Sequence, residues 1–153
     1  MKKEIETTTV RFDELRTVLG KKYIKSRLYN QYDYIRISSK GINANVIKNF
    51  ILYFKLSKFK AAEFLSISEP TIYRWTKANK KLDRNISVKL FEISELFLLG
   101  TEIFGNKESF FKWLNLPNVT LGGMEPRELV NVPEGVSKVR EILGRIEHIL
   151  AFD

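Results

Sequence analysis

The sequence predicts an all-α fold, because three of its apolar segments place their residues at helical spacing. The segment that follows Asn43 has apolar residues every three or four positions, at Val46, Ile47, Phe50, Ile51 and Phe54. Residues Ile86–Phe104 are apolar around most of a helix circumference, which is typical of a central buried helix. The last segment, Val136–Leu150, carries one apolar stripe of Val139, Ile142, Leu143, Ile146 and Ile149. We find no internal repeat and no low-complexity tract, and we expect a helical bundle.

The composition excludes several classes of protein. A chain of 153 residues forms one domain or two small ones, with enough length to bury a core. There is no cysteine, which excludes disulfides and thiolate metal sites, and the single histidine, His148, makes a metal site improbable. The N-terminus lacks the apolar core of a signal peptide. Charged residues interrupt both of the most apolar runs, so neither is expected to span a membrane, and we expect a cytoplasmic protein.

The charge is distributed unevenly along the chain. Residues 1–80 hold 17 Lys and Arg against 7 Asp and Glu, whereas residues 81–153 hold 9 against 11. A basic N-terminal half and a mildly acidic C-terminal half predict two different partners, with a polyanion bound by the N-terminal half. A general lysine enrichment that serves solubility is the alternative, and it explains the total charge better than the asymmetry.

The first forty residues are the hardest to interpret. Residues Phe12–Gly20 predict a short helix that the glycine ends, and Tyr23–Ile37 is either helical or partly extended. We interpret Ser38–Gly41 as a linker. The segment 1–40 is therefore an N-terminal arm of unassigned role, and the next helix, from Asn43, begins the second part of the chain.

Residues Lys58–Lys77 have the pattern of a helix-turn-helix, in which two short helices cross at a steep angle. Ser57 and Ser68 are predicted to cap the two helices, and Pro70 suits the first turn of the second. Ala62 supplies the small residue that the close contact between the helices requires. The residues predicted to point inward are Phe59 or Ala61, Leu65, Ile67, Ile72 and Trp75. Ser66 stands where this motif most often has glycine, so we expect an irregular turn.

The second of these helices should present a cationic surface to double-stranded DNA. The residues predicted to bind DNA are Glu69, Thr71, Tyr73, Arg74, Lys77, Lys80 and Lys81. Arg74 is the best candidate to read guanine, whereas the lysines and Arg84 are better placed to contact phosphates. An ordinary helical hairpin with a solvated basic surface is the alternative. If DNA is bound, the N-terminal arm could contact it through Lys21, Lys22 and Lys25, and otherwise the arm could dimerise or be disordered.

The C-terminal half predicts three further helices separated by turns. Gly105-Asn106 ends the central helix, and Lys107–Leu116 forms an amphipathic helix that Pro117 terminates. The glycines of the Gly122-Gly123 turn indicate backbone with a positive φ or a close approach. A short helix follows over Pro126–Asn131, and residues Val132–Gly135 should be a non-helical break before the last helix.

Nothing in the chain predicts an enzyme or a cofactor. There is no Gly-rich phosphate loop with its lysine, and His148 has no partner serine. Glu125 and Glu128 stand three apart at a helix start, where the helix dipole favours acids on any protein surface. We therefore expect a binding protein.

The C-terminal residues resemble a known family. Trp113-Leu114, Pro117-Asn118, Leu121-Gly122-Gly123, Pro126 and Leu129, followed by Gly135, Val139, Leu143 and Ile146, are similar to the toxin-binding domain of Xre/MbcA/ParS-type antitoxins. Together with the preceding helix-turn-helix, the chain resembles the Xre antitoxins of RES–Xre toxin–antitoxin modules. The chain departs from the family at Val130, Val132 and the His148-Ile149 pair.

The resemblance implies a type II antitoxin that forms a homodimer, captures a cognate toxin and represses its own operon by binding promoter DNA. It implies that the toxin is of the RES type and targets NAD. Residues expected to bind the toxin are Leu121, Gly122, Gly123, Met124, Arg127, Arg140 and Arg145, and Glu147 and Asp153 could enter an anion-receptive cleft. The expected organisation is an arm at 1–40, a helix-turn-helix region at 41–85 and a dimerisation and toxin-binding domain at 86–153. A stand-alone transcriptional regulator, whose C-terminal domain only dimerises, is the alternative, and a structural adaptor without a DNA role is a third.

Overall fold

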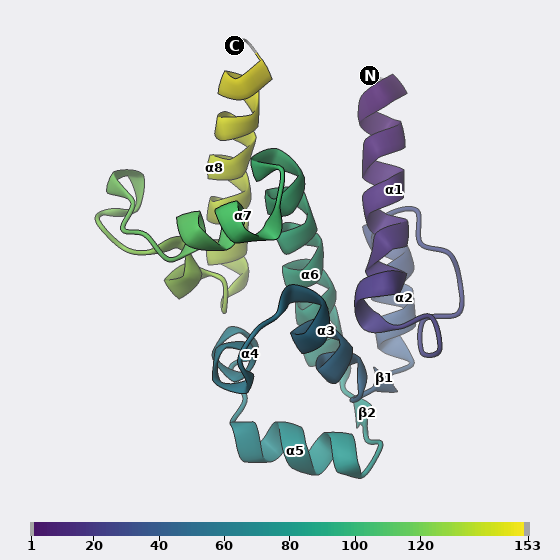
Figure 1. The fold of residues 1–153 in the computed structure, drawn as a ribbon. Helices are drawn as coiled ribbons and strands as arrows, with labels where there is room; N and C mark the ends of the chain where they lie inside the picture. The colour runs from purple at the N-terminus through teal and green to yellow at the C-terminus, as the bar shows by residue number, and fades with distance from the viewer. Residues whose placement is uncertain (1, 152–153) are drawn as a thin grey trace. The chain divides into compact units, whose positions relative to one another are not determined.

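The computed structural model of the chain describes residues 2–151, with side chains from residue 8 onward, and it is mostly helical (Figure 1). The predicted all-α class is confirmed, with one addition. Two strands of two residues each, β1 (Ile42–Asn43) and β2 (Lys81–Leu82), pair antiparallel. The chain divides into two compact units, and the boundary falls between Glu95 and Leu96, inside a long helix.

The first unit contains six helices or helix portions and the small sheet. Its elements are α1 (Lys2–Leu19), α2 (Gln31–Ser39), β1, α3 (Val46–Phe54), α4 (Lys58–Leu65), α5 (Glu69–Lys77), β2 and the first part of α6 (Arg84–Phe104). The predicted N-terminal helix was too short, because α1 begins well before Phe12. The interpretation of Ser38–Gly41 as a linker was also wrong, since Ser38 and Ser39 are the last residues of α2. Residues 2–40 thus form two helices and their connection, and of Tyr23–Ile37, which was predicted to be helical or partly extended, the part from Gln31 is helical.

Local side-chain hydrogen bonds determine where α2 begins. The Asn30 Oδ1 atom accepts hydrogen bonds from the backbone N–H groups of Tyr32, at 2.9 Å, and Asp33, at 3.3 Å. In return, Asp33 Oδ2 accepts from the backbone of Tyr29, at 2.8 Å, and of Asn30, at 3.2 Å. This reciprocal capping box satisfies backbone donors that a helix start otherwise leaves unpaired. It explains why a segment with little helical periodicity forms a helix.

Apolar side chains from α1, α2, α3 and α6 form the core of the first unit. Phe12, Tyr34 and Phe91 stack in a row, with ring centroids 6.1 Å and 5.1 Å apart. Beside them lies a buried ion pair, in which Arg11 Nε donates to Glu95 Oε1 at 2.8 Å. Because a buried charge is costly without a partner, this pair makes the position of α1 on α6 specific.

The second unit contains the rest of α6, α7 (Lys107–Leu114), the short 3-10 helices η1 (Val119–Leu121) and η2 (Pro126–Leu129), and α8 (Pro133–Ala151). Phe110 and Leu114 of α7 are fully buried, as are Val139 and Leu143 of α8. The predicted amphipathic character of α7 is confirmed, and Trp113, on the same helix, is half-buried.

Two boundaries in this unit differ from the predictions. The predicted break at Val132–Gly135 is wrong, because α8 already begins at Pro133. Proline is well accommodated there, since the first helical residues have no intrahelical acceptor for their N–H groups. Gly135 is buried in the first turn of α8, where an added Cβ would lie 1.8 Å from the carbonyl oxygen of Leu129. The segment from Pro126 is a 3-10 helix that ends at Leu129 rather than a helix to Asn131.

None of the helices in the described part of the chain combines the length and the apolar character that a bilayer-spanning segment requires.

Candidate functional surfaces

A tight turn of three residues, Ser66, Ile67 and Ser68, joins the helices α4 and α5. Ser57 Oγ accepts from the Lys60 N–H and Ser68 Oγ from the Thr71 N–H, both at 3.1 Å, so both predicted caps are confirmed. Ser66 adopts the left-handed conformation, with a φ of 54°. This is the position where glycine was expected, and serine is strained there.

The two helices pack through small and branched side chains. Ala61, Ala62 and Leu65 of α4 are buried, and so is Ile72 of α5. Of the two residues that could point inward at the start of α4, it is Ala61 that does so, because Phe59 is 64% exposed. Trp75, also predicted to point inward, is only half-buried. The packing leaves the opposite side of α5 open to solvent.

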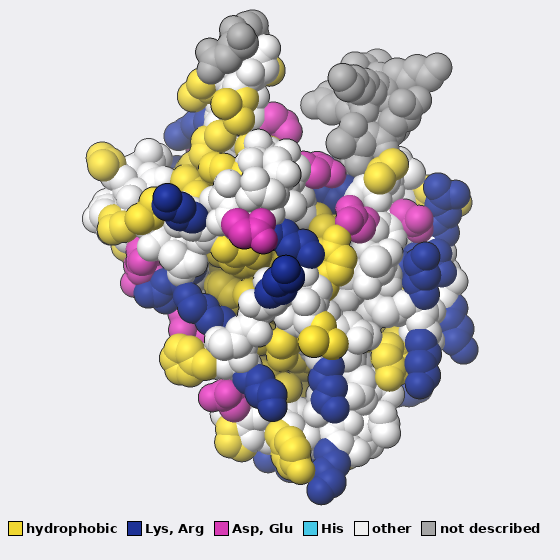
Figure 2. Space-filling view, viewed as in Figure 1, with side chains coloured by type: hydrophobic (Ala, Val, Ile, Leu, Met, Phe, Trp, Pro, Cys, Tyr) yellow, Lys and Arg dark blue, Asp and Glu magenta, His cyan; other side chains and the backbone are white. Residues whose placement is uncertain are grey.

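That open side carries the predicted DNA-contacting residues. Tyr73 is 63% exposed, and Arg74 and Lys77 beside it are exposed as well. The ammonium of Lys77 lies 5.6 Å from the centroid of the Tyr73 ring, and that of Lys80 lies 4.5 Å from the Trp75 ring. At these distances each ammonium group is attracted by the electron-rich face of the ring. In Figure 2, dark blue Lys and Arg side chains are prominent at the lower end of the first unit, where Figure 1 places α5.

The other predicted members of this surface differ in accessibility. Glu69, Lys80, Lys81 and Arg84 are exposed. Thr71 is half-buried, and its hydroxyl oxygen accepts a hydrogen bond from the hydroxyl of Ser68 at 2.7 Å, so it is engaged by the helix cap. The surface is therefore cationic at the C-terminal end of α5, and its acidic residue lies at the other end of the helix.

Three asparagines that the sequence analysis did not single out hold the C-terminal end of α5. Asn45, at the start of α3, donates from Nδ2 to the Thr76 carbonyl oxygen at 3.0 Å and to Asn79 Oδ1 at 2.9 Å. Asn43 Oδ1 also lies 2.9 Å from this Nδ2 atom, so the two N–H groups of the amide are shared among three acceptors. Next to this network, Ile42 pairs with Leu82 and Asn43 with Lys81 across the two strands. These contacts position α5 relative to α3. The only sequence signal for them is the repeated asparagine in the stretch I-N-A-N, residues 42–45.

In the second unit, the segment after α7 is a compact loop organised by Asn118. Its carbonyl oxygen accepts from the N–H groups of Leu121, at 3.0 Å, and Gly123, at 2.9 Å, and its own N–H donates to the Met124 carbonyl at 2.9 Å. Gly122 and Gly123 have φ values of 65° and 87°, so the predicted need for positive φ is confirmed. In Figure 1 this loop projects from the body of the second unit.

The loop displays apolar side chains that a folded core would normally cover. Leu116 is 50% exposed, Val119 95% and Met124 42%. Exposed apolar groups on a loop of fixed shape are typical of a protein-binding surface. Of these three, only Met124 was expected to contact a partner, because exposure of Leu116 and Val119 cannot be recognised from their residue type.

The predicted toxin-binding cations are partly engaged within the chain. Arg127 donates from Nη2 to Glu125 Oε2 at 2.8 Å, and the Glu125 N–H donates to Glu128 Oε2, also at 2.8 Å. Arg145 is exposed and paired with Glu141 on the preceding turn of α8. Arg140 is half-buried, and five positions separate it from Arg145, about 140° around a helix. The structure therefore does not bring Arg140 and Arg145 onto one side of α8.

The tail contributes less than expected. Glu147 is exposed on α8, as is His148, whereas Asp153 lies outside the described residues. Within the described part of the chain, no three His, Asp or Glu side chains come together as ligands for a metal ion.

Comparison with protein families assigns this region. Residues 99–148 match the model of the antitoxin Xre/MbcA/ParS C-terminal toxin-binding domain. The chain carries this antitoxin domain. The match confirms the resemblance seen in the sequence, and it includes α7, the Asn118 loop, both 3-10 helices and most of α8. Because the matched domain is a toxin-binding domain, the match also supports a toxin as the partner of this region. A comparison with curated proteins gives no match.

Proposed function

We propose that this chain is the antitoxin of a type II toxin–antitoxin module, acts in the cytoplasm as a homodimer, and represses its own operon. Toxin capture is assigned to the Xre/MbcA/ParS domain and promoter binding to α4 and α5, which form a helix-turn-helix in this proposal. The observation that carries the proposal is the presence, in one chain, of a toxin-binding domain and an exposed cationic helix. Neither surface requires catalysis, and we assign none.

Toxin capture is assigned to the loop between α7 and α8. Its fixed backbone presents Leu121, Gly122, Gly123 and Met124, and the exposed Leu116 and Val119 extend the same apolar surface. Apolar anchors of this kind supply binding energy when a partner covers them. Arg127, Arg140 and Arg145 are proposed as further toxin contacts, with Arg140 and Arg145 on different sides of α8. The toxin class that the resemblance favours is RES-type, acting on NAD.

DNA binding is assigned to the exposed side of α5. Arg74 is the proposed base-reading residue because it is exposed and has a planar donor pair suited to guanine. Tyr73, Lys77, Lys80 and Lys81 are proposed to contact the phosphate backbone, which positions the helix without reading sequence. Glu69 and Thr71 lie at the first turn of α5, where Thr71 mainly supports the cap.

The decisive experiment co-expresses the chain with the product of the adjacent reading frame. We expect the neighbour to arrest growth when expressed alone, and this chain to restore growth and co-purify with it. As a matched control, Arg74→Ala expressed from an unrelated promoter should restore growth equally well, because it alters only the DNA surface. A harmless neighbour that does not co-purify would contradict the antitoxin assignment, and specific promoter binding would then favour a stand-alone regulator.

A further inference from the structure

The C-terminal ends of α1 and α5 are anchored to the same side of α3. Asn49 donates from Nδ2 to the Leu19 carbonyl oxygen at 2.8 Å, and Asn45 donates from Nδ2 to the Thr76 carbonyl oxygen at 3.0 Å. The two asparagines are four positions apart and joined by a helical backbone hydrogen bond, so they lie on the same side of the helix, about 6 Å apart along its axis. The segments that leave α1 and α5 therefore start close together.

Both of these segments are cationic. After α1 come the exposed residues Lys21, Lys22 and Lys25, and residues 20–30 contain no acidic residue. After Thr76 come Lys77, Lys80 and Lys81, all exposed. The nearest acidic residue beyond them, Asp83, accepts from the Ile86 N–H at 2.9 Å and so caps α6. Exposed cations thus follow both of the helix ends that Asn45 and Asn49 hold on α3.

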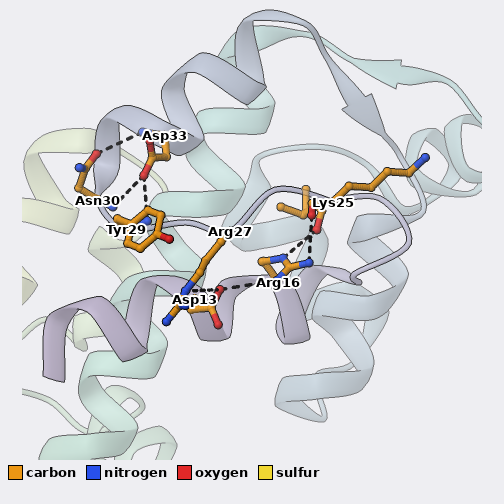
Figure 3. Close-up of polar contacts among 8 residues, drawn as sticks. Asp13, Arg16, Lys25, Arg27, Tyr29, Asn30 and Asp33 are labelled. Carbon is orange, nitrogen blue, oxygen red and sulfur yellow. Dashed lines mark hydrogen bonds and ion pairs between the residues drawn. The ribbon is translucent and has the colours of Figure 1, made fainter. Parts of the chain in front are cut away.

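Arg16 holds the connection from α1 to α2 by two hydrogen bonds to its backbone (Figure 3). Arg16 Nε donates to the Ile24 carbonyl at 3.0 Å, and Nη2 donates to the Lys25 carbonyl at 3.1 Å. Figure 3 shows the Lys25 side chain extending away from Arg16. Arg27 turns back instead, toward Asp13 at 3.9 Å.

The start of this connection is equally constrained. Gly20 has a φ of 105°, and a Cβ there would lie 2.5 Å from Asn49 Nδ2. The ammonium of Lys22 lies 5.6 Å from the centroid of the neighbouring Tyr23 ring. Within the described chain, Lys21, Lys22 and Lys25 form no ion pair with a carboxylate, which leaves their ammonium groups for an external anion.

We propose that Lys21, Lys22 and Lys25 bind backbone phosphates of the same DNA duplex that α5 contacts. This inference rests on the proposed DNA binding by α5 and extends it to a second element. Duplex DNA carries regularly spaced phosphates along each strand, and a protein uses separated cations to fix its register on them. The alternative is that these lysines, which follow the C-terminal end of α1, only interact favourably with its helix dipole. In that case their removal changes the stability of the protein and not its affinity for DNA.

The test compares two double variants of equal charge change. Lys21→Gln/Lys22→Gln removes two of the proposed contacts, and Lys112→Gln/Lys138→Gln removes two exposed or half-buried lysines from the second unit. Fluorescence anisotropy with a promoter duplex at 50–200 mM salt should show on the order of tenfold weaker binding for the first pair. The slope of log K against log salt should become shallower by about 1.8, and adding Lys25→Gln should remove about 0.9 more. The control pair should match the wild type.

The outcomes separate this inference from the proposed function. Unchanged affinity and slope in the double variant, with the wild type still binding the promoter, would overturn the second contact while α5 remains the DNA surface. A lower melting temperature with an unchanged slope would assign the lysines to helix stability and would also overturn it. A slope of log K against log salt that stays at the wild-type value in Lys21→Arg/Lys22→Arg, while it falls in the glutamine variant, would support phosphate contact. If the wild type binds no duplex at all, the proposed DNA binding itself fails.

Discussion

Gly100 of α6 lies directly against the ring of Phe110 in α7, so that a Cβ at Gly100 would meet Phe110 Cε1 at 2.2 Å. Phe110 is fully buried and also packs on Phe97, with ring centroids 5.7 Å apart. The ring therefore has little room to move away. Close packing of α6 on α7 depends on the missing side chain at this one position.

Gly100→Ala should destabilise the Xre/MbcA/ParS domain by about 1–3 kcal/mol, because the core cannot absorb the added methyl without strain. Chemical denaturation followed by circular dichroism would measure the change in free energy of unfolding. Gly144→Ala is the matched control, since Gly144 is exposed on α8 and a Cβ there would meet nothing within 4 Å. That variant should be stabilised by about 0.5–1 kcal/mol, as expected for glycine replaced in a helix interior. Equal effects of the two substitutions would contradict the proposed packing.

Arg74→Ala should weaken binding to the specific promoter by about 1–3 kcal/mol and relax the preference for one base pair. The expected loss is that of the bidentate contact to guanine that we propose for Arg74. Anisotropy titrations with the promoter and with a shuffled duplex of the same composition would measure both effects. Equal losses on the two duplexes would show that Arg74 contacts phosphate only.

Gly123→Val should abolish toxin capture and leave promoter binding intact. Gly123 has a φ of 87°, which valine adopts only with strain, so the loop that displays Met124 would be rebuilt. Gly105→Val is the matched control, because Gly105 has the same φ of 87° and the same open surroundings but ends α6, outside the loop. Co-purification with the toxin should fail for the first variant only. Simultaneous loss of toxin and promoter binding would indicate that the loop is needed for folding.

The stability of the first unit should fall at high pH through Tyr53. Burial, together with the Glu14 carboxylate that accepts from the Tyr53 hydroxyl at 2.6 Å, raises the pKa of Tyr53 well above its usual value. Between the unfolded and folded pKa the native state keeps a proton that the unfolded state has lost, so the free energy of unfolding decreases as pH rises above about 10. Urea unfolding at pH 9 and pH 11 should show a smaller decrease for Tyr53→Phe than for the wild type. Identical pH dependence in the two proteins would contradict this coupling.

Local signals in the sequence predicted the boundaries of α4 and α5 better than those of α1 and α2. Ser57, Ser68 and Pro70 act through neighbouring backbone atoms, so their pattern is visible in a few consecutive letters. The extent of α1 and the start of α2 depend on contacts with α6 and on the Asn30–Asp33 capping box, which periodicity does not reveal.

The candidate surfaces were predictable to different degrees. Exposure of Tyr73 and Arg74 was predicted from the inward positions of Ile72 and Trp75. The structure buries Ile72 but leaves Trp75 half-buried, and it is Thr76 that is buried beside Ile72. The shared anchoring of two helix ends by Asn45 and Asn49 could not be predicted, because it joins residues about thirty positions apart. The exposure of Val119 was equally hidden, since an isolated valine is more often buried.

The ion pair between Arg11 and Glu95 has a consequence for trimming the chain. If a protease or a shortened gene removed α1, the Glu95 carboxylate would lose its ion pair with Arg11. This carboxylate has almost no access to water. Loss of one partner of such a pair typically weakens a fold by about 3–5 kcal/mol, a large share of what holds a small protein together. Digestion from the front end should therefore unravel the first unit as a whole instead of releasing a shorter, still functional fragment.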